Sequence, residues 1–575
     1  MASIKTTTLD GTTAMAEAAG ATTLSSAVLD SAHVGDIQGA FGTVRLGESG
    51  AQRGLSRRLK TLLAIIGPGL IVMVGDNDAG AFGTYTQAGQ NYGTRLLWTL
   101  LLLVPVIYVN QEMVLRLGTV TGVGHARLIM ERFGKFWGAF SVIDLFILNA
   151  LTIVTEFIGI SLGLGYLGLP KVPGGIVAAT VVIAAASTGS FQRFERVCLA
   201  LVAGSLVLVP ILVMVHPPAG QLVHDFVIPG LPGGSGQLST VMLLIIAIVG
   251  TTVAPWQLFF QQSYIIDKRI TPAYLRYEKV DLGIGIVVVI LGAVAMMAFS
   301  SAAFAGTQGA GNFTDAAGIA VGLEHAAGRA AGVLFAIGLI DASIIGAAAV
   351  GLSTSYAVGD VLGIKHSLHR KPSEAKAFYT VFTLLLAGSA AIVLIPGSPL
   401  GLITEGVQTL AGVLLPSATV FLLLLCNDKA VLGPWVNSTK VNVFTGAVIA
   451  VLIMLSTVLT ASVVFPDLGS GAILAILGVG TGVSGLVGLG MAVRALRNRR
   501  TEPAAIQDDA NATIETAPAP VEVVDKASWR MPPLALLARP ELSLARRAGL
   551  ALMWVYLVMA CGLVVVRVAQ LALGH

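Results

Sequence analysis

Two aspartates, Asp76 and Asp78, lie in a stretch that otherwise has the composition of a hydrophobic helix, "IVMVGDNDAGAFGTYTQAG" over residues 71–89. A charged side chain at the centre of a bilayer costs about 2.5 to 3.5 kcal/mol on insertion scales, and it is tolerated mainly where it faces a cavity or a partner. No lysine or arginine lies near the middle of this stretch to balance the two acids. We therefore expect Asp76 and Asp78 to face a cation that arrives from solution.

A second polar interruption follows in "VGTTVAPWQLFFQQ", over residues 249–262. Thr251 and its neighbour offer carbonyls and hydroxyls, and Gln257 and Gln261 offer amide oxygens. Pro255 has no backbone N–H, so a helix here cannot satisfy the carbonyl that this group would normally bond. A helix that unwinds at Gly75 would free carbonyls in the first stretch too, and the partial negative charge of its C-terminus would favour a cation.

The ligands on offer at both interruptions are oxygen atoms, without cysteine or histidine. Such ligands suit Mg²⁺, Ca²⁺ or Mn²⁺ better than iron, copper or zinc. Mg²⁺ gives up its water reluctantly, and the small residues Ala81 and Ala254 leave room for a partly hydrated ion. The alternative is that the acids accept hydrogen bonds from a refolded helix end and bind nothing.

The whole chain has the composition of a multispanning membrane protein. It has 575 residues, of which 55% are hydrophobic and only 11% are charged, against roughly 25% charged residues in a soluble domain. A span needs about 20 mostly apolar residues. Thirteen such runs are expected, and they start near Leu59, Leu96, Phe136, Gly174, Glu195, Leu238, Val280, Gly328, Ala377, Leu400, Val441, Gly471 and Ala548.

The apolar runs divide the chain into four parts. We expect a disordered cytoplasmic tail over residues 1–52, a transporter core of about 12 helices over residues 53–497, a disordered linker over residues 498–545, and an additional transmembrane helix over residues 546–575. Lysine and arginine concentrate in every second short loop, which predicts a cytoplasmic N-terminus. The three cysteines are scattered singly inside apolar runs, so no disulfide and no thiolate metal site is expected. The net charge of +4 follows from the loops and does not imply nucleic acid.

The two polar interruptions fall in the first and the sixth predicted spans. This offset of five spans is the one expected of a five-plus-five inverted repeat, in which two broken helices occupy corresponding positions. We therefore expect an all-α multipass fold with broken helices 1 and 6 and extra helices at the C-terminus.

Five blocks of sequence resemble the NRAMP family of divalent metal transporters. "GPGLIVMVGDNDAGAFGTYTQAGQNYGTRLLW" is similar to the first-helix signature of that family, and "NQEMVLRLGTVTG" to the end of its second helix. "TIVTEFIG", "GTTVAPW" and "LLPSATVFLLLLCNDKAVLG" are similar to its third, sixth and tenth helices. The resemblance runs from about Gly67 to Gly433 and implies a leucine-transporter-like fold and proton-coupled uptake of manganese and iron.

Carried over by position, the resemblance places the family's metal-binding aspartate at Asp78 and its sixth-helix carbonyl ligand at Thr251. Gly75 as a carbonyl ligand of the first helix is our inference from the break. The family's motif asparagine is replaced by Ala81, and its metal-binding methionine by Ala254. Loss of the thioether removes the soft ligand that favours transition metals over magnesium.

The proton-pathway positions of the family also change in this chain. The third-helix aspartate corresponds to Ile153, whereas the glutamate remains as Glu156, and the sixth-helix histidines correspond to Trp256 and Gln261. Tryptophan and glutamine cannot relay a proton near pH 6.5 as histidine does. These changes resemble those of the NRAMP-related magnesium transporters, a branch that moves magnesium and manganese and is thought not to couple to protons. Asp76 has no acidic counterpart in the family, and we infer that it enlarges the negative field for a hydrated dication.

Other polar residues leave alternatives open. Glu156 could carry a proton, support the site as a hydrogen-bond acceptor, or serve structure, and we favour the last two. Asp341 lies in the eighth span and is either functional or paired across helices. Gln408 aligns loosely with a tenth-helix glutamine that can reach the metal. His125, His366 and His369 fall in predicted cytoplasmic loops, where we expect solvated side chains.

These observations predict a transporter of the plasma (inner) membrane, and not an enzyme, that moves Mg²⁺ and also Mn²⁺ by alternating access without proton coupling. The expected partners are the divalent ion and the lipid bilayer, with no cofactor and no nucleic acid; the oligomeric state is left open. One alternative is proton-coupled Mn²⁺ or Fe²⁺ uptake through Glu156. Another is a divalent-cation sensor that does not transport.

Overall fold

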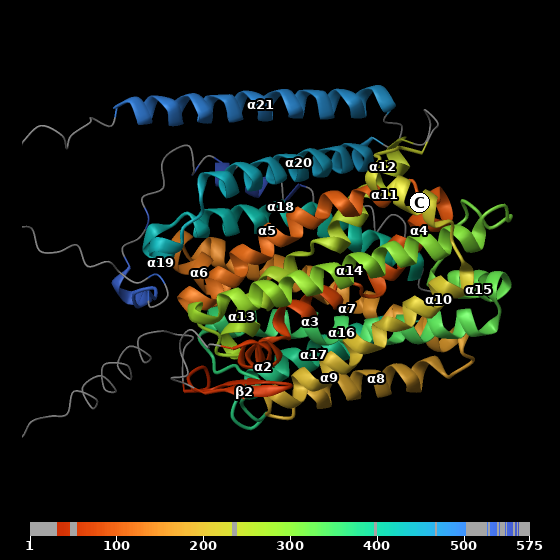
Figure 1. The fold of residues 1–575 in the computed structure, drawn as a ribbon, viewed down its shortest axis with the longest axis horizontal. Helices are drawn as coiled ribbons and strands as arrows, with labels where there is room; N and C mark the ends of the chain where they lie inside the picture. The colour runs from red at the N-terminus through yellow and green to blue at the C-terminus, as the bar shows by residue number, and fades with distance from the viewer. Residues whose placement is uncertain are drawn as a thin grey trace, which may run out of the picture.

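The computed structural model shows a bundle of long helices that run side by side (Figure 1). It describes residues 31–45, 54–232, 238–395, 400–465 and 469–501, together with short stretches between residues 526 and 562. The helices of the first half are α2 (Leu55–Ile65), α3 (Pro68–Val74), α4 (Ala79–Tyr92), α5 (Leu97–Thr121), α6 (His125–Phe133), α7 (Lys135–Tyr166), α8 (Lys171–Ala186), α9 (Phe191–Gly204), α10 (Leu208–Val215) and α11 (Ala219–Val227). Those of the second half are α12 (Leu238–Thr252), α13 (Pro255–Asp267), α14 (Leu275–Phe304), α15 (Ala316–Ala327), α16 (Arg329–Leu362), α17 (Lys376–Val393), α18 (Leu400–Cys426), α19 (Lys429–Leu432), α20 (Thr439–Val464) and α21 (Ser470–Thr501).

The number of spans agrees with the sequence pattern. Within the described residues, ten helices are long and apolar enough to cross a membrane, and α8 is a shorter apolar helix. The first predicted span is the pair α3 and α4, whose 7 and 14 residues are each too few to be counted among the ten. Together they account for the twelve helices expected of the core. The thirteenth run, over residues 546–575, lies mostly outside the described residues.

Both predicted breaks are present. The first separates α3 from α4 at residues 75–78, and the second separates α12 from α13 at Val253 and Ala254. Pro255 occupies the first turn of α13, where its missing N–H costs nothing, and so it starts a new helix instead of continuing the old one. The all-α prediction with broken helices 1 and 6 is therefore confirmed.

Close helix packing brings the two broken helices together in the middle of the bundle. Both α3 and α4 pack against α14, α12 packs against α18, and α13 packs against α5 and α16. A Cβ added to Gly69 of α3 would lie only 2.6 Å from the backbone nitrogen of Leu282 in α14. A glycine is needed at this contact, as small residues generally are where membrane helices approach closely.

A short β-hairpin precedes the helices and corrects one prediction. Strands β1 (Ile37–Gly39) and β2 (Gly42–Val44) pair antiparallel, with Ile37 opposite Val44. The expectation that residues 1–52 lack structure is therefore wrong for residues 31–45. The composition is that of a polar tail, but two residues distant in sequence hold the segment in place. Glu195 Oε2 accepts a hydrogen bond from Ala40 N, and Arg269 Nε donates one to Ala32 O.

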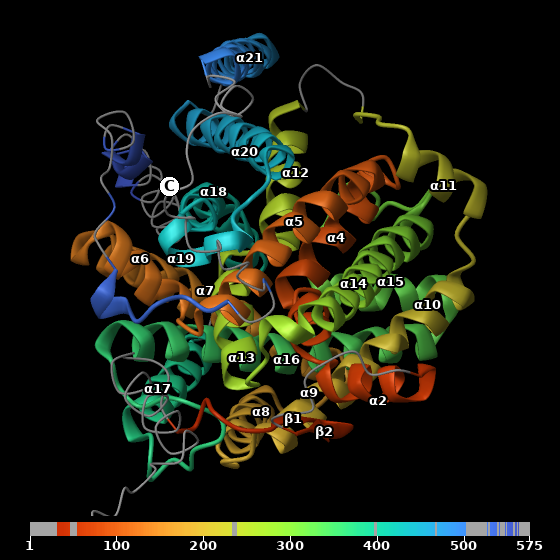
Figure 2. The same ribbon diagram turned by 60° about the vertical axis from the view of Figure 1, so that its left-hand side comes forward.

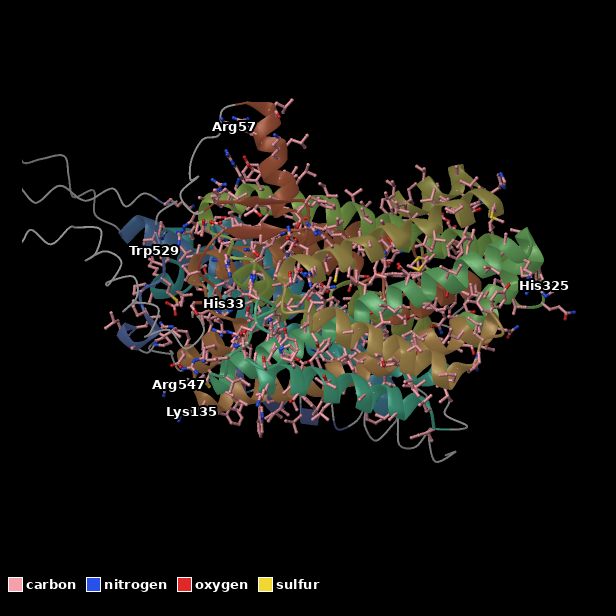
Figure 3. All side chains as sticks on the ribbon, turned by 90° about the horizontal axis from the view of Figure 1, so that it is seen from below. His33, Arg57, Lys135, His325, Trp529 and Arg547 are labelled. Carbon is pink, nitrogen blue, oxygen red and sulfur yellow. The ribbon has the colours of Figure 1, made fainter. Side chains whose placement is uncertain are left out.

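The bundle has two distinguishable ends. We call the end that carries β1, β2 and α2 the hairpin end, and the other the α15 end. Figure 3 shows Lys135 and Trp529 toward one end and His325 of α15 at the opposite one.

The histidines at the hairpin end correct another prediction. We expected them to be solvated, but His125 and His366 are only 0% and 3% exposed. They are buried because Gln262 and Asp360 supply polar partners.

The C-terminal part lies at the edge of the bundle. Helix α21 packs against α20 and stands apart from the core (Figure 2). Most of the predicted linker over residues 498–545 is outside the described residues, but two described parts of it contact the core. Trp435 Nε1 donates to Lys526 O at 2.8 Å, and Met531 N donates to Val120 O at 3.3 Å.

Candidate functional site

The first break is held open by two carboxylates that take backbone amides away from the helix. Ala79 N donates to Glu156 Oε2 at 3.2 Å, and Ala81 N donates to Asp78 Oδ1 at 2.8 Å. In a continuous helix Ala79 N would bond Gly75 O, four residues earlier. Gly75 O therefore loses its usual donor and is available to a ligand, as the sequence predicts.

The second break frees a carbonyl by a different route. Thr251 O lies four residues before Pro255, which has no N–H to donate to it. The Thr251 hydroxyl is also buried and has no hydrogen-bond partner among the described residues. The neighbouring hydroxyl of Thr252, by contrast, bonds Tyr85 Oη at 2.7 Å. The two breaks thus offer a matched pair of carbonyls, from Gly75 and Thr251.

Asp76 lies beside this pair and is buried, with 1% of its surface exposed. Its Oδ1 accepts from Gln257 Nε2, and its Oδ2 has no partner within the described residues. Asp78 is 3% exposed and is close enough to Asp76 for the two charges to interact. The structure therefore brings both acids and Gln257 to one place, although Gln257 presents its amide nitrogen and not its oxygen.

Gln408 reaches the same break from α18. A Cβ added to Gly80 would overlap Gln408 Nε2 and would lie 3.2 Å from Asp78 Oδ1. The nitrogen has no partner in the described part of the chain. The structure thus places Gln408 at the start of α4, beside the capping aspartate.

Glu156 belongs to the site as a neighbour of Asp78. Glu156 Oε2 holds the amide of Ala79, the residue after Asp78, and Glu156 Oε1 is among the described buried atoms that lack a partner. A Cβ on Gly346 of α16 would come 2.8 Å from the carboxyl carbon of Glu156, so a larger residue there would displace that carboxyl group. Glu156 therefore supports the first break.

Trp256 closes the site on the side of the second half-helix. Its ring lies near Gly75, whose added Cβ would be 3.8 Å from Trp256 Cη2, and Ser353 Oγ donates to Trp256 O at 2.9 Å. Gln261 lies one turn further along α13, fully buried, with no partner for either amide atom among the described residues.

Three predicted positions contribute no side-chain ligand to this group. Asp341 lies against α9, because a Cβ on Gly204 would be 2.6 Å from Asp341 Oδ1. Ala81 and Ala254 bring no side-chain ligand; Ala81 contributes the amide that caps Asp78, and Ala254 is the residue just before α13.

Both carboxylate oxygens of Glu278 and other buried polar atoms across the bundle lack a partner among the described residues, and six more such atoms lie at the two breaks. These six are Asp76 Oδ2, Asn77 Oδ1, Glu156 Oε1, Thr251 Oγ1, Trp256 Nε1 and Gln408 Nε2. Nowhere in the described residues do three or more His, Cys, Asp or Glu side chains form a group that could hold a metal ion. An ion bound here would therefore need carbonyl, amide or water oxygens in addition to the carboxylates, which suits a hard cation.

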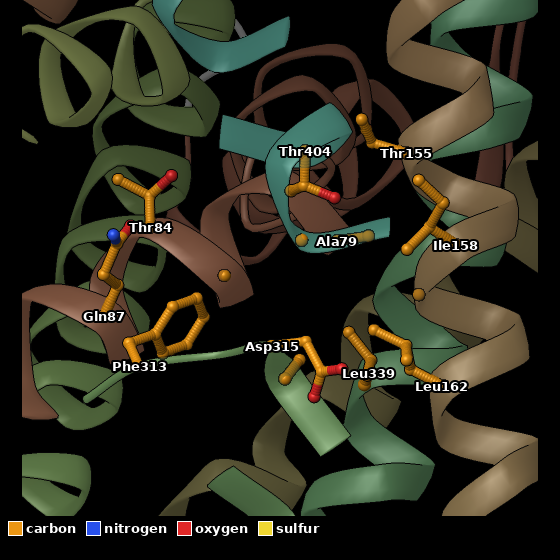
Figure 4. Close-up of a pocket in the computed structure, with 14 residues that line it drawn as sticks. Ala79, Thr84, Gln87, Thr155, Ile158, Leu162, Phe313, Asp315, Leu339 and Thr404 are labelled. Atoms are coloured by element: carbon orange, nitrogen blue, oxygen red, sulfur yellow. The ribbon is translucent and has the colours of Figure 1, made fainter. Parts of the chain in front are cut away.

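A cavity leads from the first break toward the α15 end (Figure 4). It encloses about 410 Å³, open solvent included, and its lining includes Ala79, Thr84, Gln87, Asp315 and Thr404. Ala79 is the first residue of α4, so this cavity starts at the break. Asp315 adds a negative charge at its outer part, where Asp315 Oδ1 also caps α15 by accepting from Gly318 N at 2.9 Å.

Sequence reasoning missed two residues that contact the site. Gln111 of α5 donates through Nε2 to Gln257 Oε1 at 2.9 Å, and Tyr85 of α4 bonds Thr252. The only signal in the sequence was the polar pair Asn110 and Gln111 inside an apolar run. Their partners come from a different helix, so the sequence alone could not assign them.

Comparisons with known proteins show which family the chain resembles. The family model described as natural resistance-associated macrophage protein-like (Nramp) matches residues 69–462. The divalent metal cation transporter MntH of Aeromonas hydrophila subsp. hydrophila is 27% identical over 428 residues, which cover 70% of this chain and 97% of that protein. MntH of Ralstonia nicotianae is 28% identical over 417 residues, 68% of this chain and 89% of that protein.

A solved structure shares the fold. The manganese transporter of Eremococcus coleocola, crystallised with an aromatic bis-isothiourea substituted compound, matches with a TM-score of 0.59 at 20% identity. The match covers 79% of this chain and 98% of that chain. The similarity to this structure is therefore not restricted to the two broken helices and covers most of the bundle.

Proposed function

Since this chain belongs to the Nramp family of membrane transporters for divalent metal cations, we propose that its main substrate is Mg²⁺, that Mn²⁺ is a second substrate, and that transport is not coupled to protons. The observation that carries this proposal is the set of ligands at the two breaks. It consists of two carboxylates, two freed carbonyls and amide groups, without sulfur or imidazole. Hard oxygen ligands of this kind suit Mg²⁺, which is usually held by one or two carboxylates with waters retained.

The ion is held by Asp78 and Asp76 together with the carbonyls of Gly75 and Thr251. Before the ion arrives, the two neighbouring acids repel each other, so binding relieves a strain that is present in the empty site. Gln408 and Gln257 line the site, and the alanines at positions 81 and 254 leave room for water on the ion.

The route through the protein follows from the cavity. The site opens toward the α15 end, and Trp256 covers the other side of the break. Basic loops lie at the hairpin end, among them those that carry Arg127, Arg193 and Lys371, and the excess of positive charge places that end in the cytoplasm. In this proposal the cavity beside the first break faces the outside of the plasma membrane.

Competition between ions tests the choice of substrate. Liposomes that contain the purified full-length chain and an internal Mn²⁺-quenched dye report Mn²⁺ entry. An excess of external Mg²⁺ should suppress that entry, because both ions use the same carboxylates, whereas an equal excess of Na⁺ at matched ionic strength should not. Mn²⁺ entry that is indifferent to Mg²⁺ would contradict the proposal.

A second candidate function has one observation in its favour. Glu156 bonds the backbone amide of Ala79, next to Asp78, and a proton held by one of these two carboxyl groups could be displaced by an incoming cation, as proton-coupled Mn²⁺ or Fe²⁺ transport requires. A dye for internal pH in the same liposomes decides between the two. Acidification that accompanies metal entry and disappears in Glu156→Gln would favour the coupled transporter, and metal binding without any entry would favour a sensor.

A further inference from the structure

Three polar side chains, two on helices and one in the first break, form a chain of hydrogen bonds that ends at the site. Gln111 of α5 donates to Gln257 of α13, and Gln257 donates to Asp76 at the first break. All three are buried: Gln111 and Gln257 are 0% exposed and Asp76 is 1% exposed. At the far end of the chain, Gln111 Oε1 has no partner among the described residues.

The direction of the hydrogen bonds from Gln111 to Gln257 and from Gln257 to Asp76 suits a site without an ion. Each amide has a donor end and an acceptor end, and both donor ends here point toward Asp76. A carboxylate without a cation is stabilised by that donor. A divalent cation beside Asp76 reverses the requirement, because the ion attracts the amide oxygen and repels the amide N–H groups.

We propose that Gln111 is a positioning residue which allows the Gln257 amide to reverse when the ion binds. In the reversed state Gln257 Oε1 faces the ion, and Gln257 Nε2 donates to Gln111 Oε1, the atom that now lacks a partner. The hydrogen bond between the two amides is kept, and Asp76 exchanges a donor for the cation. This inference rests on the proposed function and specifies how the site changes when its substrate arrives.

A neighbouring glutamine shows why this pair can reverse. Gln262, also on α13, donates to the carbonyl oxygen of Val123 at 2.7 Å and meets His125 Nδ1 with its Oε1 at 3.0 Å. A carbonyl can only accept, so the orientation of Gln262 is fixed. Gln257 contacts another amide, which can itself turn over, and the two ends of an amide have nearly the same shape. Reversal therefore needs rotation of two side chains and no movement of a helix.

Two substitutions at position 111 should act in opposite directions. Gln111→Glu provides only acceptors when ionised, holds Gln257 in the reversed orientation and should lower the Kd for Mn²⁺ by about tenfold, the worth of one hydrogen bond. Gln111→Leu removes the partner that the reversed amide needs and should raise the Kd by a similar factor of about ten. Calorimetric titration of the purified full-length protein with Mn²⁺ alone at pH 8 measures both.

A control separates positioning from added charge. Asn110→Asp introduces the same charge one residue away on α5, where the structure shows no bond to Gln257, and should leave the Kd within about twofold of the wild type. If Gln111→Glu and Gln111→Leu both weaken binding, or if neither changes it, Gln111 is merely structural and the inference is overturned. An equal gain in Asn110→Asp would overturn it too.

The result also distinguishes the inference from the proposed function. If the wild-type protein binds no Mn²⁺, the proposed function fails; if it binds and Asp78→Ala abolishes binding, the function stands whatever position 111 does. Should Gln111→Glu fail to fold, infrared difference spectra of the wild type with and without Mn²⁺ decide. A shift of a glutamine carbonyl band that is absent in Gln257→Leu is expected, and no shift would contradict the reversal.

Discussion

We propose that the residue before the second half-helix, Ala254, helps to determine which ion the site prefers. Ala254 presents a methyl group where a sulfur atom would add a soft ligand for transition metals. Ala254→Met should therefore shift the ratio of Mn²⁺ to Mg²⁺ uptake toward Mn²⁺, on the order of tenfold, or about 1.4 kcal/mol. Ala254→Leu has a similar volume without sulfur and is the matched control. Equal ratios in the wild type and both variants would remove the argument from ligand hardness.

Gly80 tests the contribution of Gln408. A Cβ at position 80 would overlap the end of the Gln408 side chain, which can bend away without unfolding the helix. Gly80→Ala should therefore displace Gln408 from the site and reduce initial Mg²⁺ uptake by about tenfold, as expected for the loss of one ligand contact worth about 1.4 kcal/mol. Gly83→Ala, one turn away, meets only Thr404 Cγ2 at 3.4 Å and should transport at nearly the wild-type rate. Equal rates in the two variants would show that Gln408 is dispensable.

At the residue scale, the sequence predicts the acids better than their partners. Asp76 and Asp78 are recognisable because charge inside an apolar run is rare, and Pro255 marks the second break by its chemistry. Gln111, by contrast, gains its role from a helix more than a hundred residues away. The carbonyls of Gly75 and Thr251 are free for reasons that only the structure shows in full, since Glu156 takes the amide that Gly75 would otherwise bond.

At the scale of elements, the hairpin is joined to the half-helix α3 through one buried ion pair. Lys268 Nζ contacts Glu195 Oε1 at 2.6 Å and donates to the carbonyls of Ile65 and Ile66, directly before α3. Glu195 Oε2 accepts from Ala40 N of the hairpin. The pair is fully shielded from solvent, with 0% of either side chain exposed.

Breaking this pair should destabilise the protein. Glu195→Gln leaves the Lys268 ammonium buried without the charge of Glu195, which costs about 3 to 5 kcal/mol. The variant should therefore have a lower melting temperature, and protease should cleave more readily within residues 31–45. Glu131→Gln breaks the exposed pair of Glu131 with Arg127 instead and should cost under about 1 kcal/mol. Equal melting temperatures for the two variants would contradict a structural role for the hairpin.

The loop after α16 should be sensitive to pH. His366 is buried and faces Asp360, Asp267, Tyr356 and the ring of His33. Burial lowers the pKa of His366, but the hydrogen bond and the charge of Asp360 raise it more, so its pKa lies above the usual value. The Nδ1 of the ring faces Ile364 O and its Nε2 faces Asp360, and both partners accept when Asp360 is ionised.

The sign of the effect follows from that shift. Because the pKa of His366 is higher in the folded protein than in the unfolded chain, where it is about 6.5, its protonation stabilises the fold. This stabilisation is fully present below about pH 6.5 and is lost as the pH rises through the pKa of the folded state. The melting-temperature difference between the wild type and His366→Gln should thus be larger at pH 6 than at pH 8.5. The pKa of His369 is lowered, mainly by burial, so His369→Gln should show the opposite trend. A difference that does not change with pH would refute the assignment.

The elements themselves were predictable to differing degrees. Long apolar runs and the two interruptions gave the helices and the breaks, because both depend on local composition. The hairpin was not predictable, since its two three-residue strands depend on contacts with α2, with α9 and with the chain beyond α13. The burial of His125 escaped for the same reason, since its partner Gln262 lies on a distant helix, whereas His366 meets Asp360 across the turn that follows α16.

At the scale of the whole molecule, the site lies between a cavity and a closed side. The cavity begins at Ala79 beside the break and includes Asp315 at the start of α15, whereas Trp256 lies near Gly75 and the ion pair of Lys268 is buried toward the hairpin. Transport by alternating access requires these two conditions to exchange, so the contacts at the hairpin end must open when the cavity closes.

Influx of Mg²⁺ into liposomes that contain only the purified full-length chain tests the central claim most directly. An internal Mg²⁺ indicator should report a rise that saturates with external Mg²⁺, that is retained in Glu131→Gln, and that is lost in Asp78→Ala. Internal Mg²⁺ that stays at the level of protein-free liposomes, or an undiminished rise in Asp78→Ala, would contradict the account.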